Sequence, residues 1–125
     1  MKINIPGLDV ESGLDVCGGD LGIYQYSLNL YVTSIPAFLE KMRLVSKETN
    51  VSAETMHDYS ITVHSLKAIS EYVGAKEARA TAKQLEAMAK EGNIDGIKAQ
   101  NETYIKYLEK LVSEIQNWLD HNKTE

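Results

Sequence analysis

His64 and Lys67 lie one helical turn apart in the segment Ser60–Gly74. Residues three and four positions apart share a face of a helix, so Lys67 and Ala68 are expected beside the imidazole. The apolar residues of this stretch recur at helical spacing on another face and are predicted to be buried: Tyr59, Val63, Leu66, Ile69 and Val73. The sequence therefore predicts an imidazole that faces solvent, next to an ammonium group and a small side chain.

An exposed histidine of this kind can carry a phosphoryl group on a ring nitrogen. That chemistry needs a neutral nitrogen, a positive group for the phosphoryl oxygens, a partner that fixes the ring tautomer, and room for another protein. Lys67 supplies a mobile ammonium, and each charge-assisted contact of this type contributes about 1.5 to 3 kcal/mol. The small side chain of Ala68 leaves space for another protein to approach the ring.

The partner of the ring can be placed by counting across a predicted hairpin of helices. Residues at equal distance from the turn face each other in antiparallel helices. Glu86 lies as far after Ala75 as His64 lies before it. A carboxylate there would accept the Nδ1 proton and leave Nε2 free to attack phosphorus. Gln84 is a weaker candidate for the same role.

Two lysines, Lys83 and Lys90, lie about one turn either side of Glu86 and would add positive potential to this face. They also offer a second interpretation of Glu86. Its carboxylate could pair with either lysine along its own helix, a surface interaction worth only about 0.2 to 0.5 kcal/mol. Both interpretations stay open at the level of the sequence.

The segment before the first long helix is rich in turn residues and is predicted to hold only a short helix between Val10 and Cys17, which forms a lid at one end. A long helix follows from Leu21, with an apolar stripe at Tyr24, Leu28, Tyr31, Ile35, Phe38, Met42 and Val45. Pro36 lacks an amide proton and disfavours the α conformation at the residue before it. We therefore expect this helix to be bent or broken near Pro36, in two collinear or slightly kinked pieces.

Three further helices are expected, over 52–73 with Ser52 as its cap and Gly74 as its stop, over 76–90 with Gly92-Asn93 as its stop, and over 94–118 before a polar tail at 121–125. Their buried faces are predicted from the spacing of Ala78, Ala82, Leu85 and Ala89, and of Ile94, Ile97, Asn101, Tyr104, Leu108, Leu111, Ile115 and Trp118. Four long amphipathic helices with short connections predict an all-α fold, an antiparallel up-down four-helix bundle.

The chain of 125 residues has the size of one domain, and we assign 1–125 to it. Its net charge of -5 argues against binding to nucleic acid, which depends on clustered lysines and arginines. No apolar run approaches the roughly 18 to 20 residues that span a bilayer, and Met1-Lys2 opens no signal-peptide pattern. We expect a cytoplasmic protein without a membrane partner, in which the single Cys17 is a small buried side chain in a reducing compartment.

The strings His64-Ser-Leu-Lys67-Ala68, Gly74-Ala75 and Gln84-Leu85-Glu86 resemble the signature of the histidine-containing phosphotransfer (HPt) domains of two-component phosphorelays. The residues that precede the first long helix are similar to the N-terminal part of the same family: Ile5-Pro6-Gly7-Leu8-Asp9, Gly13-Leu14 and Gly18-Gly19-Asp20, followed by Tyr24 and Leu28. The resemblance covers about Ile5 to Trp118. The chain departs from the family at Ala68, where glycine is usual, and the added methyl would make the approach of a receiver slightly tighter.

This resemblance implies a four-helix bundle whose histidine takes a phosphoryl group from an aspartate of one receiver domain and gives it to another. It implies that His64 is the phosphoacceptor, that Lys67 is the cation beside the phosphate, and that Glu86 is hydrogen-bonded to the ring. The partners would be response-regulator receivers, with a hybrid sensor histidine kinase as a further candidate. No cofactor is expected on this chain, since Mg²⁺ would be held by the receiver. Docking is expected at Ile61, Ala68, Glu71, Lys83 and Lys90.

Three rival functions are weighed against this one. Sensor kinases have an acidic residue after the histidine and a proline shortly afterwards, whereas Ser65 follows here and no proline occurs after Pro36. No glycine-rich nucleotide lid is present either, so we expect a phosphocarrier without kinase activity. The phosphoacceptor domain of a chemotaxis-type histidine kinase shares the fold and a similar motif, and a non-catalytic adaptor bundle would bind a receiver without accepting phosphate.

Two further expectations concern metals and oligomeric state. Glu54 and His57 match half of a di-iron bundle motif, but the sequence has no second Glu-x-x-His, and no cysteine and histidine group has zinc spacing. We therefore expect no metal site, and we interpret His57 as an incidentally exposed side chain. A bundle with no spare apolar stripe is expected to be a monomer.

Overall fold

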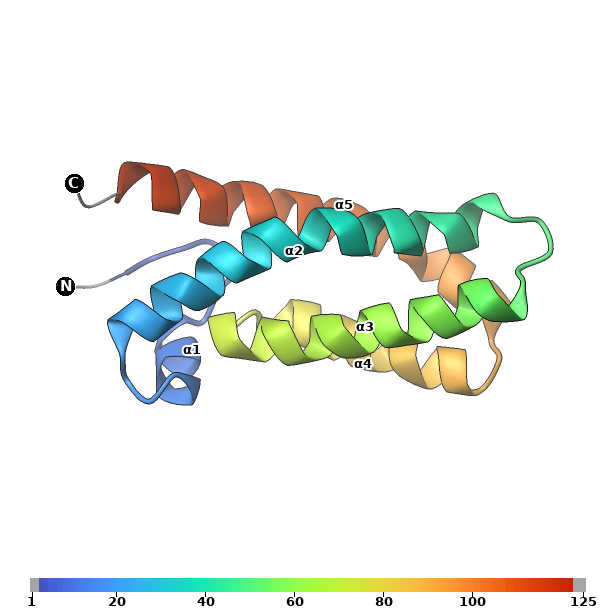
Figure 1. Ribbon diagram of the computed structural model, residues 1–125, viewed down its shortest axis with the longest axis horizontal. Coiled ribbons are helices and arrows are strands. Elements are labelled where there is room, and N and C mark those ends of the chain that lie inside the picture. The colour runs from blue at the N-terminus through green and yellow to red at the C-terminus, as the bar shows by residue number, and fades with distance from the viewer. Residues whose placement is uncertain (1–2, 123–125) are drawn as a thin grey trace.

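The computed structural model describes residues 3–122, which form five α-helices and no strand (Figure 1). The helices are α1 Val10–Val16, α2 Leu21–Lys47, α3 Ala53–Val73, α4 Lys76–Lys90 and α5 Ile94–His121. The predicted all-α class is confirmed. Helix α5 extends through His121, where the sequence predicts a tail, while the rest of that tail after residue 122 and the opening Met1-Lys2 lie outside the described residues.

The four long helices lie side by side, and successive ones run in opposite directions (Figure 1). In this view α2 and α5 lie above α3 and α4, and contacts join α2 to α3, α3 to α4, α4 to α5 and α2 to α5. These contacts are compatible with the predicted antiparallel bundle. The short α1 packs on α3 and α2 at one end of the molecule, where the sequence predicts a lid. No helix among residues 3–122 has both the length and the apolar character needed to cross a bilayer.

Of the two outcomes predicted for α2, bent or broken near Pro36, the break does not occur, since the helix continues through Pro36. Its ribbon changes direction near the middle (Figure 1). An interior proline costs about 3 kcal/mol. Ile35 and Leu39 on either side are almost fully buried, and burial of each such side chain contributes about 1.5 to 3 kcal/mol. Tertiary packing therefore offsets the hydrogen bond that the proline removes.

The core consists of the inward faces of all four long helices, and most of the predicted stripes are buried. At three positions a neighbour is buried in place of the predicted residue: Leu39 rather than Phe38, Ser70 rather than Ile69, and Glu86 rather than Ala89. Ile94 and Trp118 of α5, also predicted to be buried, are only partly buried. The replaced apolar residues, like Trp118, are partly buried and pack against the core. The last two differences place polar groups inside, where each has a partner.

Buried polar groups connect neighbouring helices. The Tyr31 hydroxyl on α2 and the Ser70 hydroxyl on α3 lie 2.9 Å apart. The side-chain amide of Asn101 on α5 donates to the carbonyl of Met42 on α2 at 2.7 Å. Since a buried polar group without a partner is costly, these bonds favour one register of each helix against its neighbour.

Gly74 ends α3 in the left-handed conformation, with φ of +78°, and turns the chain into α4. Its carbonyl accepts a hydrogen bond from the backbone N–H of Asp9 at 2.8 Å, which attaches the segment before α1 to the α3–α4 turn. A Cβ at Gly74 would lie 1.9 Å from the carbonyl oxygen of Asp9. Two separate requirements therefore demand glycine at this position.

We predict that Gly74→Ala destabilises the protein more than Gly92→Ala. Gly92 also has a positive φ, of +70°, but a Cβ there meets nothing within 4 Å. The control variant should therefore cost only about 1 to 2 kcal/mol for the left-handed conformation, while Gly74→Ala should add the displacement of Asp9. Urea unfolding of both variants measures the difference, and equal midpoints would show that the contact between Asp9 and Gly74 contributes nothing to stability.

Candidate functional site

His64, Lys67 and Glu86 meet in the groove between α3 and α4. Nδ1 of His64 lies 2.6 Å from one carboxylate oxygen of Glu86, and Nζ of Lys67 donates to the other oxygen at 2.7 Å. Glu86 therefore occupies the position that counting across the hairpin predicts. The interpretation of Glu86 as a surface pair with Lys83 or Lys90 is wrong, since no ion pair within residues 3–122 joins it to either lysine.

The three side chains differ sharply in their exposure. The His64 side chain is 65% exposed, Lys67 is 26% exposed and Glu86 is 9% exposed. The ring is hydrogen-bonded to the protein through Nδ1, and no hydrogen bond in the described part of the chain involves Nε2 of His64. The site thus presents one ring nitrogen to solvent and holds the other against a nearly buried carboxylate.

The charge of Glu86 determines the tautomer of the neutral His64 ring. The hydrogen bond from Lys67 lowers the pKa of the Glu86 carboxyl most, burial opposes that effect, and the contact with His64 lowers the pKa further. The carboxylate is therefore ionised at neutral pH and can only accept hydrogen bonds. Because Nδ1 must then donate, the neutral ring carries its proton on Nδ1 and a lone pair on Nε2.

The local sequence explains why α4 brings a carboxylate so close to α3. Ala78, Ala82 and Leu85 form the buried face of α4, and the small alanines let the two helix backbones approach closely. Gly74 makes the connection short. Helix α4 can therefore direct Glu86 into the groove, where Lys67 and His64 pair with it.

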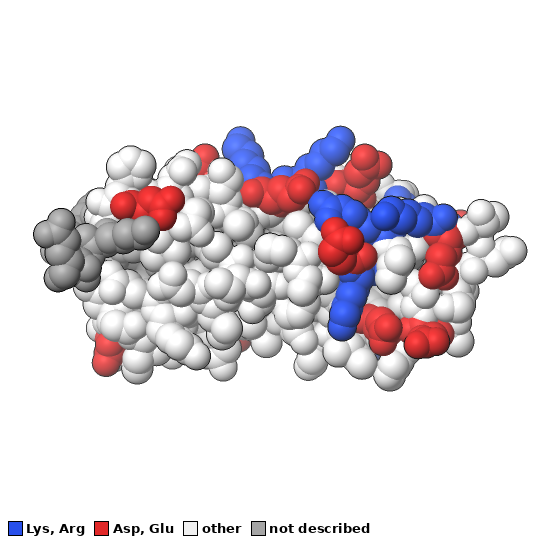
Figure 2. Space-filling model, turned by 45° about the horizontal axis from the view of Figure 1, so that its top comes forward, with Lys and Arg blue, Asp and Glu red and all other residues white. Residues whose placement is uncertain are grey.

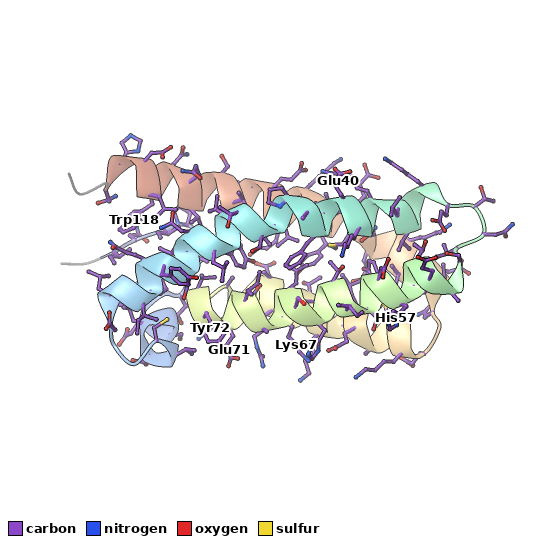
Figure 3. All side chains as sticks on the ribbon, in the orientation of Figure 1. Glu40, His57, Lys67, Glu71, Tyr72 and Trp118 are labelled. Atoms are coloured by element: carbon purple, nitrogen blue, oxygen red, sulfur yellow. The ribbon has the colours of Figure 1, made fainter. Side chains whose placement is uncertain are left out.

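The other predicted site residues are exposed. Ile61, Ala68 and Glu71 lie on the solvent side of α3, and the side chain of Ile61 is 52% exposed. Figure 3 shows Lys67 and Glu71 on the same edge of α3, the edge beside α4. The remaining predicted residues, on α4, are exposed as well: Lys83, Gln84 and Lys90. Gln84 makes no hydrogen bond to His64 within residues 3–122, so the structure favours Glu86 over it.

The sequence analysis missed an uncharged surface on the first half of α2. No charged residue occurs between Leu21 and Leu39, and Figure 2 shows few charged side chains over this half of α2. Ile23 and Leu30 share a face of the helix and are 51% and 44% exposed. Tyr72 on α3 is 49% exposed. The long run of residues without charge could have indicated this surface from the sequence.

Cys17 joins this uncharged surface to the end of α3. Its thiol is buried, as predicted, and donates to the carbonyl of Tyr72 at 3.6 Å, while the hydroxyl of Ser27 on α2 lies 3.9 Å away. The residue that ends α1 therefore contacts both α2 and the end of α3. Among the described residues, no group of three or more histidine, cysteine, aspartate or glutamate side chains could hold a metal ion.

Stability should fall in acid partly through Glu86. Because its pKa is lowered in the folded state, the unfolded chain takes up the proton first as the pH decreases below about 4.3. The contribution of Glu86 is thus fully present above that pH and is lost as the pH falls through the folded pKa. Glu86→Gln should flatten this dependence, measured as urea unfolding free energy between about pH 3 and 7.

A matched control for this measurement is Glu91→Gln, since Glu91 is exposed just after α4 and has no ion pair within residues 3–122. Asp9, whose pKa is lowered to about 2 chiefly by a hydrogen bond from Lys76, contributes with the same sign in all three proteins. The readout is therefore the difference between variant and parent. If Glu86→Gln and Glu91→Gln follow the same curve, the bonds to Glu86 do not contribute to folding.

Comparisons with protein-family models, curated proteins and solved structures find no match to this chain. The resemblance to HPt domains therefore depends on the residues quoted from the sequence. The function that follows is argued from the geometry of His64, Lys67 and Glu86.

Proposed function

We propose that this protein is a histidine phosphocarrier of a two-component phosphorelay. His64 would accept a phosphoryl group from the aspartyl phosphate of one receiver domain and give it to another. The observation that carries the proposal is the state of His64, whose Nδ1 is bonded to an ionised, nearly buried Glu86 while Nε2 faces solvent. The antiparallel four-helix bundle is the architecture proposed with it, and the helix contacts are compatible with that arrangement.

The transfer conserves every atom and charge. The lone pair of Nε2 attacks phosphorus, the P–N bond forms, and the bond between phosphorus and the aspartyl oxygen breaks, which returns the receiver carboxylate. The ring keeps its proton on Nδ1 and becomes positive. Glu86 stabilises this charge because its carboxylate oxygen lies 2.6 Å from Nδ1. The reverse displacement, by the carboxylate of the next receiver, restores the neutral ring.

Lys67 supplies the cation for the moving group. In the resting state its ammonium is bound to Glu86 at 2.7 Å, one helical turn from His64. A phosphoryl group on Nε2 brings further negative charge within reach of this flexible side chain. Lys67 can then turn towards the phosphoryl oxygens while Glu86 keeps its bond to the ring.

The surroundings of His64 also support a protein partner. Ile61 and Ala68 are exposed one helical turn either side of His64 on α3, and the neighbouring helix α2 adds the exposed apolar side chains of Ile23 and Leu30. Exposed apolar patches of this kind mark protein contact sites. A receiver that covered them would bring its phosphorylated aspartate to Nε2 and exclude water from the reaction.

His64→Gln should abolish phosphorylation and leave the fold intact, since its side chain is mostly exposed. The test uses phosphoramidate and a panel of phosphorylated receivers as donors, with acid-labile, base-stable phosphate as the readout. The control is His57→Gln, which changes an exposed histidine two turns earlier on the same helix. A His64→Gln variant that accepts phosphate as fast as the parent would refute the proposal. A parent that binds receivers but gains no phosphate is an adaptor.

Lys67→Ala should slow phosphorylation of His64 about tenfold or more, because one charge-assisted contact to the transferred group is lost. Single-turnover transfer rates measure this, with far-ultraviolet circular dichroism as the check of folding. Lys110→Ala is the matched control, since Lys110 is exposed on α5 and forms no ion pair within residues 3–122. Equal rates for both variants would remove Lys67 from the mechanism.

A further inference from the structure

A second polar site lies on the same groove, about two helical turns from His64. A pocket of about 430 Å³ opens between α1, the end of α3 and the start of α4, and is lined by Ser12, Val16, Ser70, Glu71, Gly74, Ala75, Lys76 and Arg79. Glu71 lies as far before Ala75 as Arg79 lies after it, the same relation that pairs His64 with Glu86. The distance along α3 from His64 to Glu71 is about 10 Å.

Arg79 is the unusual member of this pocket. Its Nε is fully buried without a hydrogen-bond partner, and no hydrogen bond or ion pair within residues 3–122 involves its guanidinium. Arg43, the other arginine of the chain, pairs with Glu40 at 2.8 Å and with Glu109 at 3.0 Å. A partly buried guanidinium with unpaired donors is costly, so an acceptor supplied by a ligand would stabilise it.

The other groups of the pocket indicate what that acceptor is. Lys76 adds a second cation, although its ammonium is partly neutralised by Asp9 at 2.8 Å. Ala75 caps α4 without a side-chain hydrogen bond, which leaves amide donors of the first turn beside the same space. Glu71 lines the pocket and opposes a negative ligand. Planar guanidinium donors match a carboxylate in a two-point contact.

We infer that the pocket around Arg79 binds an acidic side chain of the protein that exchanges phosphate with His64, and so provides a second docking contact for that protein besides the surface around the histidine. This inference rests on the proposed function for the identity of the partner. The inference that the Arg79 pocket binds a carboxylate does not depend on the proposed function. The partner would place an apolar surface on α2 and α3 and a carboxylate in the pocket about two helical turns along α3 from His64.

The first test asks whether the pocket binds carboxylates. Acetylated tetraglutamate is titrated into the ¹⁵N-labelled full chain, and the Nε–H resonances of Arg79 and Arg43 and the backbone amides of Ser12 and Lys76 are followed. We expect saturable shifts at Arg79, Ser12 and Lys76 and none at Arg43. The Kd should rise on the order of tenfold in Arg79→Gln and fall in Glu71→Gln, while Arg43→Gln matches the parent.

Three results would overturn this inference. An equal response to acetylated tetraglutamine would show that charge is irrelevant. Tighter binding of inorganic phosphate than of the acidic peptide would make the pocket a phosphate site and not a docking contact. An unchanged Kd in a folded Arg79→Gln variant would show that the peptide binds elsewhere.

The second test links the pocket to phosphate exchange. Arg79→Gln should slow the loading of His64 from a phosphorylated receiver on the order of tenfold at low salt and leave loading from phosphoramidate unchanged, since the small donor needs no docking contact. Equal loading from the receiver by Arg79→Gln and parent would overturn the docking role. If neither donor labels the parent, the proposed function is refuted instead. Peptide binding is then measured on His64→Gln, which retains the pocket, and an unchanged Kd shows that the pocket binds carboxylates independently of the phosphorylation of His64.

Discussion

The carboxylate of Glu86 is shared between Nδ1 of His64 and the ammonium of Lys67, at 2.6 and 2.7 Å. A nearly buried carboxylate is costly without partners, so these two bonds are what allow Glu86 to be placed inside the groove. They also set the tautomer of the ring and hold a cation one turn away. One set of contacts therefore satisfies a requirement of folding and a requirement of the chemistry.

That sharing depends on how closely α3 and α4 approach. Gly74 makes a tight left-handed turn, and the alanines of α4 allow close packing. The bond from Asp9 to Gly74 fixes the turn against the segment before α1. The N-terminal segment is thus distant from His64 along the chain, yet it stabilises the hairpin that positions Glu86.

The helices and the placement of Glu86 beside His64 could be predicted from the sequence, because both follow from local periodicity and one short turn. Counting from Ala75 placed Glu86 opposite His64, and it would also have placed Arg79 opposite Glu71. What it could not predict depends on packing. On α2 the core contains Leu39 rather than Phe38, and the burial of Ile35 and Leu39 offsets the cost of a proline inside a continuous helix. The unpaired state of Arg79 is likewise visible only when neighbouring helices are in place.

His64 projects from the middle of a regular helix and offers a single nitrogen on a single side of the protein. Two visiting proteins cannot reach that atom at once, so under the proposed function donor and acceptor must alternate. Signal flow would then be governed by the residence time of each visitor. A variant that dissociated more slowly from its receiver would slow the relay even though each individual transfer remained fast.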